Sequence, residues 1–146
     1  MISNATKAPW HLWLVGISAL LFNAIGAFDY AMNMAQGATY MKGAGMTPPQ
    51  VAHYQQLPPW VIVVWGVGAW GSFIGAALLL FRNRLALPIL TASAVAFALY
   101  LFHMYILSDG GIIMGASLAV AGVFIAAVLS FCIWYAKRMT AQGVLT

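Results

Sequence analysis

The polar residues that lie inside apolar stretches are the best candidates for chemistry in this sequence. Asn23, Asp29 and Tyr30 lie toward the end of one such stretch, and His103 lies toward the end of another. Polar groups at membrane depth are costly, and for that reason they mark functional sites by default. At ~1.5 Å of rise per helical residue, Asp29 and His103 reach the same boundary of a bilayer. The four residues form a possible polar cluster, a small-solute or proton site in which Asp29 and His103 would favour each other's ionised forms.

The same cluster, to which the adjoining loops add His53 and Asp109, also has a purely structural interpretation. Asp29 would hydrogen-bond at an interface, His103 would bond a carbonyl, and Asn23 would join two helices. We favour this interpretation, because within the cluster only Asn23 lies deep enough to demand an internal partner. The sequence leaves open whether Asp29 and His103 meet.

Metal, haem and catalytic chemistry have no specific carrier in the chain. The single cysteine, Cys132, permits no intramolecular disulfide and no cysteine cluster. The three histidines fall at different depths, which disfavours a haem with two histidine ligands. The chain has no H-x-x-x-H, Gly-x-Ser-x-Gly, P-loop or Cys-x-x-Cys pattern. We expect a non-enzymatic protein with neither cofactor nor metal. A group of methionines could ligate copper(I), although adaptable apolar packing is the favoured interpretation of Met32, Met34, Met41 and Met46.

The composition requires lipid as the solvent for most of the chain. Of the 146 residues, 64% are hydrophobic and 5% are charged, which excludes a soluble globule. Four runs, about 10–35, 59–81, 85–107 and 111–136, are long enough to cross a hydrocarbon core of ~30 Å as helices. Backbone groups in lipid must pair within their own segment. The sequence therefore predicts one all-α membrane domain over residues 1–146, with four transmembrane helices in an antiparallel bundle.

The basic residues predict the orientation of these helices. With four spans, the N-terminal tail, the loop between spans two and three, and the C-terminal tail share one face. They carry five basic residues, against Lys42 alone on the other face: Lys7, Arg82, Arg84, Lys137 and Arg138. Cytoplasmic loops are enriched in Lys and Arg, so both termini should be cytoplasmic, in the inner membrane of a bacterium. The net charge of +4 therefore serves topology, and we expect no nucleic-acid partner.

The loop between spans one and two contains the one extramembrane helix that the sequence predicts. Thr47 and Gln50 have the spacing of a capping box, and Pro48 occupies the first helical position. We predict a short helix from Pro48 to Gln56, lying on the outer interface because it has no charge. Gly37, Gly43 and Gly45 are predicted to form turns.

Two stripes of small residues are the most prominent packing signal. Span two has Gly68, Gly71, Ser72 and Gly75 on one face, and span four has Gly115, Ala119, Gly122 and Ala126. Small residues let helix backbones approach closely in lipid. These stripes serve either the internal bundle or contact with other chains.

Several stretches together resemble a known family. They are Trp10 to Trp13, Phe22 to Tyr30, Met46 to Pro48 with Gln50, Pro59-Trp60, and Trp65-Gly66 to Ser72. This pattern is similar to a family of small four-span proteobacterial inner-membrane proteins of unestablished function, some of them labelled sugar transporters. The resemblance covers the first half of the chain and implies fold and location; it supplies no catalytic residues.

The sequence is compatible with three functions. The leading hypothesis is a membrane protein that acts through helix packing, as a homo-oligomer or as an accessory subunit of a larger membrane complex. The alternative is an oligomeric transporter of a small neutral or sugar-like solute, with Trp65 and Trp70 as ring contacts. The third is a pH-responsive or proton-linked element at the outer face, built on Asp29 and His103.

Overall fold

The computed structural model describes residues 6–146, which form helices and no strand. Four helices are long and apolar enough to cross a membrane. They are α1 (Trp10–Gln36), α4 (Pro59–Leu80), α5 (Ala86–Phe102), which a π-helical turn η1 (His103–Leu107) extends, and α7 (Ala116–Ala141). Three short helices connect them: α2 (Ala38–Gly43), α3 (Pro48–Gln55) and α6 (Gly110–Met114). The predicted all-helical class with four candidate spans is confirmed; the predicted domain also includes residues 1–5, which lie outside the described part.

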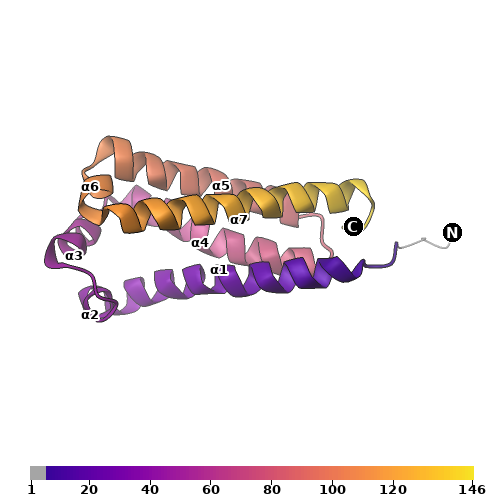
Figure 1. Cartoon of the computed structure of the whole chain (residues 1–146), viewed down its shortest axis with the longest axis horizontal. Coiled ribbons are helices and arrows are strands. Elements are labelled where there is room, and N and C mark those ends of the chain that lie inside the picture. The colour runs from indigo at the N-terminus through magenta and orange to yellow at the C-terminus, as the bar shows by residue number, and fades with distance from the viewer. Residues whose placement is uncertain (1–5) are drawn as a thin grey trace.

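The four long helices pack one against the next in a curved row, so that the last helix comes round toward the first. α1 packs on α4, α4 on α5, and α5 on α7. The two outermost helices, α1 and α7, scarcely approach each other along their backbones. The start of α1 and the C-terminus lie at one end of the bundle, here called the termini end, and α2, α3 and α6 lie at the other, the loop end (Figure 1).

The α4–α5 interface is built from the small residues of span two. A Cβ atom on Gly71 would lie 3.2 Å from Ser93, and one on Gly75 would lie 2.6 Å from Leu90. Gly68 also faces α5, and its carbonyl accepts a 2.6 Å hydrogen bond from the Ser93 hydroxyl. The stripe therefore brings two helices of the same chain together, as small residues do in lipid.

The fourth span differs from its prediction in both bounds and stripe. Helix is interrupted at Gly115, whose φ of +62° favours glycine, so the long helix begins at Ala116 and continues to Ala141. Gly115 serves this break and has no close neighbour for a Cβ atom. Ala119 faces outward, Ala126 is half-buried and Gly122 is buried. The four residues therefore do not form one interface.

The loop helix is confirmed, with Gln55 as its last residue. The backbone N–H of Thr47 donates to Gln50 Oε1 over 3.0 Å, as expected for a capping box. The side-chain amide of Gln50 also donates to the carbonyl of Ile113, which joins α3 to α6. Helix α2 was not predicted; it follows a turn at Gly37, whose φ is +52°, and Gly43 belongs to α2.

Arg82 ties the termini end together. It has a φ of +59°, and its guanidinium donates to the carbonyls of Val144 and Thr6. Its own carbonyl accepts from the N–H of Thr146 over 2.8 Å. These bonds compensate the cost of a left-handed conformation in a residue with a side chain.

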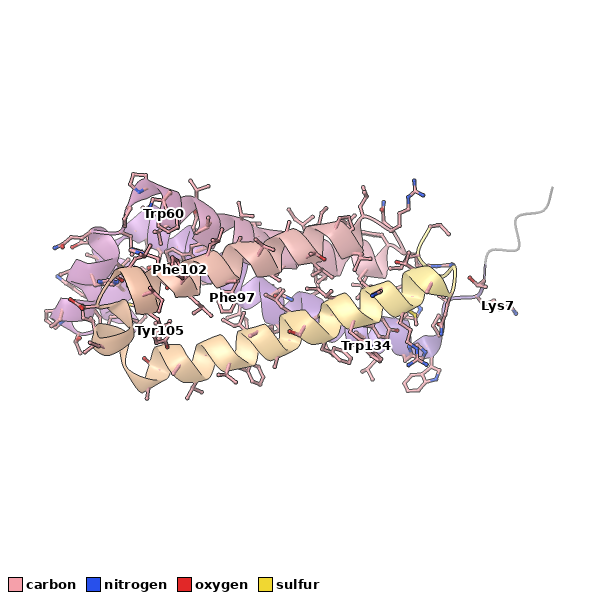
Figure 2. All side chains as sticks on the ribbon, turned by 90° about the horizontal axis from the view of Figure 1, so that it is seen from above. Lys7, Trp60, Phe97, Phe102, Tyr105 and Trp134 are labelled. Carbon is pink, nitrogen blue, oxygen red and sulfur yellow. The ribbon has the colours of Figure 1, made fainter. Side chains whose placement is uncertain are left out.

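Aromatic side chains mark both ends of the bundle (Figure 2). Trp60 and Tyr105 lie toward the loop end, while Trp134 lies toward Lys7 at the other end. The Arg138 guanidinium sits 5.6 Å from the Trp134 ring centroid. Rings with a polar edge prefer the depth of lipid headgroups, so this placement fits a bundle that crosses a bilayer.

Candidate functional site

A cavity of about 450 Å³ lies among the four long helices in the half of the bundle toward the loop end. Its walls come from α1, α4, α5 and α7, with Tyr40 and Tyr54 from the loop helices. Its side chains are mostly apolar, and none of the described residues that line it is basic. The cavity forms where the row of helices fails to close.

The opening of this cavity lies in the α1–α7 seam, the facing sides of those two helices. Ile25 and Phe28 on α1 and Phe124 on α7 belong to the lining, yet each is at least 59% exposed. Residues that are exposed on the side of a transmembrane bundle face acyl chains. The cavity is therefore accessible laterally, from the lipid.

Two side-chain contacts bridge the α1–α7 seam. The Phe22 and Phe124 rings meet edge to face with centroids 5.4 Å apart, and nearer the termini end His11 is hydrogen-bonded to the Tyr135 hydroxyl. A second hollow of about 510 Å³, lined only by α1 and α7, lies on the far side of the phenylalanine pair. Phe22 and Phe124 border both spaces and form the partition between them.

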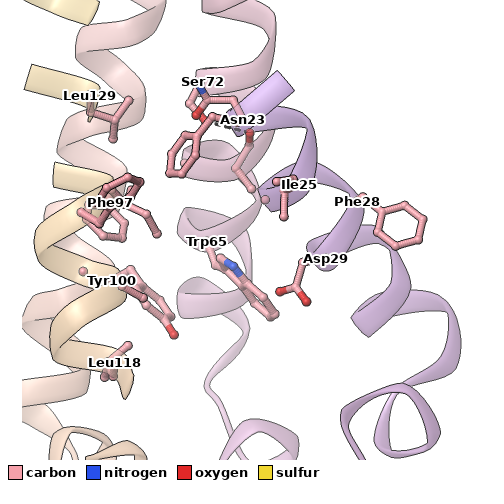
Figure 3. Close-up of a pocket in the computed structure, with 18 of the residues that line it drawn as sticks. Asn23, Ile25, Phe28, Asp29, Trp65, Ser72, Phe97, Tyr100, Leu118 and Leu129 are labelled. Atoms are coloured by element: carbon pink, nitrogen blue, oxygen red, sulfur yellow. Dashed lines mark hydrogen bonds between the residues drawn. The ribbon is translucent and has the colours of Figure 1, made fainter. Parts of the chain in front are cut away.

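Trp65 is the centre of an aromatic wall. Its ring centroid lies 5.0 Å from that of Tyr30, 5.5 Å from that of Tyr54 and 6.2 Å from that of Tyr100. The Tyr54 and Tyr100 hydroxyls are hydrogen-bonded over 2.9 Å. Except for Tyr30, these rings line the cavity. Figure 3 shows the Trp65 ring between Tyr100 and Asp29.

The polar groups of the cavity lie at its two ends. At the deep end Asn23 is buried and donates to the carbonyl of Ala19, and Ser72 donates to that of Ala69. At the loop end the Asp29 carboxylate accepts a 3.0 Å hydrogen bond from Tyr40. Most side-chain donors are therefore already used within the protein.

The surroundings of the two loop tyrosines raise their pKa values. The hydrogen bond to Asp29 raises the pKa of Tyr40 above its usual 10.0, and burial adds to the effect. Burial raises the pKa of Tyr54, and the hydrogen bond with Tyr100 offsets part of that shift. Both hydroxyls keep their protons at neutral pH, so Asp29 is the only lining side chain of acidic type.

The expected polar cluster is divided between two places. Asn23 and Asp29 line the cavity, and Tyr30 lies beside them, donating weakly to the carbonyl of Ile62. His103 does not line it: this residue is 6% exposed, stacks on Trp60 and has no hydrogen-bond partner among the described residues. Asp29 and His103 therefore have different partners in the structure, Tyr40 and Trp60.

The two tryptophans expected to contact a solute also have different positions. Trp65 lines the cavity, whereas Trp70 is 41% exposed and packs edge to face on Phe73 of its own helix. The Trp70 ring is therefore not part of the cavity wall. Of the span-four stripe, only Gly122 borders the cavity.

Sequence reasoning missed Tyr40 and the role of Tyr54. A signal existed for Tyr40: an acidic residue near the end of a span needs a hydrogen-bond donor, and Tyr40 follows eleven residues later. Tyr54 sits on the confirmed loop helix, and helix periodicity alone does not place it against Tyr100.

The cavity combines apolar walls, several aromatic rings and one carboxylate. Within residues 6–146 no three His, Cys, Asp or Glu side chains gather as metal ligands would. Comparison of the chain with protein-family models, with curated proteins and with solved structures finds no match. The resemblance drawn from the sequence stays a prediction.

Proposed function

We propose that this protein is a non-enzymatic membrane protein that binds a small, largely apolar molecule in the cavity among its helices. The observation that supports this proposal is the cavity of about 450 Å³, which has an aromatic wall and opens to the side of the bundle. Sites for small molecules typically enclose ~300–1,000 Å³, with mostly apolar walls and a few placed polar groups. A molecule dissolved in the bilayer would reach this site without crossing water.

We further propose an antiparallel bundle in a bacterial inner membrane, with both termini cytoplasmic. The distribution of charge supports it. Lys7, Arg82, Arg84, Lys137 and Arg138 all belong to the termini end, and Lys42 lies in α2 at the loop end. The bias of Lys and Arg toward cytoplasmic loops then assigns the termini end to the cytoplasm.

The chemistry of the cavity favours an apolar ligand over a sugar. A sugar presents several hydroxyl groups, each of which loses its water on binding and needs a partner. Here Asn23 and Ser72 donate to their own helices, and Tyr40 donates to Asp29. Transport of a sugar-like solute is therefore the weaker alternative.

The packing role and the pH-responsive role receive less support. Gly68, Gly71 and Gly75 face α5 of the same chain, so they are not free to bind a partner subunit or a second copy. Asp29 bonds Tyr40, and His103 stacks on Trp60, so a titrating pair has no geometric basis.

A single-tryptophan protein tests the proposal. Five of the six tryptophans are at least 41% exposed, so replacing them with Phe leaves Trp65 as reporter: Trp10, Trp13, Trp60, Trp70 and Trp134. In phosphatidylcholine nanodiscs we expect para-bromoneopentylbenzene, or its quaternary ammonium isostere, to quench Trp65 saturably, because bromine quenches on contact.

The variant Gly26→Leu is designed to block the cavity. Gly26 lines the cavity and a Cβ atom there would meet nothing within 4 Å, so a larger side chain fills space without strain. Leu21→Phe is the matched control, since Leu21 is exposed on the same helix and borders neither hollow. Saturable quenching lost in Gly26→Leu alone supports the proposal. Quenching that is linear in probe concentration, or unchanged by Gly26→Leu, overturns it.

A further inference from the structure

The charge balance of the cavity identifies the class of its ligand. The chain has only two acidic residues, and one of them, Asp29, lines the cavity. The other, Asp109, is exposed and lies outside it. The Asp29 carboxylate accepts a hydrogen bond from neutral Tyr40, which supplies no positive charge. No basic side chain is among the described residues that line the space.

A carboxylate in such surroundings attracts a cation. Coulomb interactions strengthen as the effective dielectric constant falls, and apolar walls lower it. Intramembrane acids are normally paired for this reason. A ligand that carried one positive charge would supply the counter-charge that the protein lacks.

The aromatic wall beside Asp29 suits an organic cation better than a metal ion. Trp65, Tyr54 and Tyr100 line the cavity, and aromatic rings attract ammonium groups to their faces. Figure 3 shows the Asp29 carboxylate directed toward the Trp65 ring. A metal ion would need several carboxylate, imidazole or carbonyl ligands in place of rings. One carboxylate beside several rings matches a cation with apolar substituents.

The remaining walls specify those substituents. Phe97, Leu118 and Ile125 continue the cavity away from Asp29, and access is from the lipid side. We propose that the ligand is a lipophilic organic cation, a quaternary or protonated amine whose nitrogen lies between Asp29 and Trp65. This inference rests on the proposed function and adds the charge of the ligand.

Two isosteres that differ only in charge test it. Para-bromobenzyltrimethylammonium is the cation, and para-bromoneopentylbenzene replaces its nitrogen with carbon. Both are titrated into nanodiscs that hold the protein with Trp65 as sole tryptophan, and quenching is compared at equal measured bilayer concentration. We expect the cation to bind roughly tenfold more tightly than its neutral isostere.

Asp29→Asn should remove that preference while neutral binding persists, and Asp109→Asn, the matched control, should leave it intact. If both isosteres bind equally to the parent protein, or if Asp29→Asn keeps the preference, the inference is overturned and the proposed function stands. If neither isostere quenches Trp65 saturably, the proposed function itself fails. The comparison on the parent protein decides the question even where Asp29→Asn does not fold.

Discussion

The α4–α5 interface and the α1–α7 seam use small residues to opposite effect. In the first, Gly71 and Gly75 let α5 approach until a Cβ atom would collide with Ser93 or Leu90. In the second, Gly26 on α1 has no neighbour within 4 Å of such an atom. A glycine in a lipid-embedded helix thus brings a neighbour closer in one place and leaves room for a ligand in another.

The difference comes from what stands beside the glycines. Along the α1–α7 seam the rings of Phe22 and Phe124 meet and hold the helices at the width of two side chains. At the level of Gly68 the α4–α5 interface is closer, because Ser93 bonds directly to the backbone of that glycine, whereas Trp65 and Tyr100 stack across the interface nearer the loop end. Bulky contacts at one level of a seam create space at the next.

The largest loss of stability should come from overpacking the α4–α5 interface. Gly75→Leu places atoms where Leu90 already lies, 2.6 Å from a Cβ position, and its backbone N–H is within 3.4 Å. We expect a loss of about 3 kcal/mol or failure to fold, because overpacked cores must shift backbone. Gly26→Leu should keep parental stability. Thermal unfolding by circular dichroism measures both, and equal stabilities would show that the two seams are packed alike.

A smaller effect should follow from removing the phenylalanine partition. Phe124→Ala deletes an edge-to-face pair on a side chain that is already 59% exposed, so we expect a loss of about 1 kcal/mol. It should also join the two hollows and increase quenching of Trp65 by brominated lipid. Phe81→Ala, at an exposed position beside neither hollow, is the control. Unchanged quenching in Phe124→Ala would mean that the pair does not separate the spaces.

The hydrogen bond between His11 and Tyr135 should contribute about as much as the phenylalanine pair. It bridges the same seam nearer the termini end, and a single hydrogen bond contributes about 0.5–1.5 kcal/mol net. Tyr135→Phe should lower stability by an amount in that range. A double-mutant cycle with His11→Phe should give a stabilising coupling free energy between the two residues. A coupling free energy of zero would show that this contact does not stabilise the seam.

The smallest effect concerns the loop end of the cavity, where Tyr40 donates a hydrogen bond to Asp29. The pKa of Tyr40 is raised in the folded protein, so its contribution to stability is fully present below the ordinary value of 10.0 and is lost as pH rises through the raised one. The stability difference between the parent and Tyr40→Phe should therefore be constant from about pH 7 to about pH 9 and shrink above that range. A difference that grew with pH would reverse the assignment.

The sequence was sufficient for features that depend on composition or local spacing. Hydropathy identified four spans, and Thr47 with Gln50 located a helix to within one residue of its end. Hydropathy does not say which side of an apolar helix faces inward, since every side is apolar. Trp65 and Trp70 illustrate this: five residues correspond to ~500° of helical rotation, so the two rings point in different directions. One lines the cavity and the other faces out.

The candidate site depended on tertiary events that local patterns do not encode. The π-helical turn at His103 changes the direction of the side chains that follow it, and Gly115 shifts the start of the last span by several residues. Asp29 and Asn23 were identified from depth alone, and they do line the cavity. The rings that line the aromatic wall come from α3, α4 and α5, so the wall exists only once these three helices pack together.

The lateral mouth of the cavity has a consequence for handling the protein outside its membrane. A detergent with a short tail and a cationic or zwitterionic head resembles the molecule that the cavity is suited to hold, and in a micelle it is present at far higher local concentration than any added compound. Such a detergent would compete for the site between Phe124 and Trp65, so occupancy measured in micelles would reflect the surfactant more than the ligand. Extraction in an anionic amphiphile, whose head group the Asp29 carboxylate would repel, would leave the site free to report its own preference.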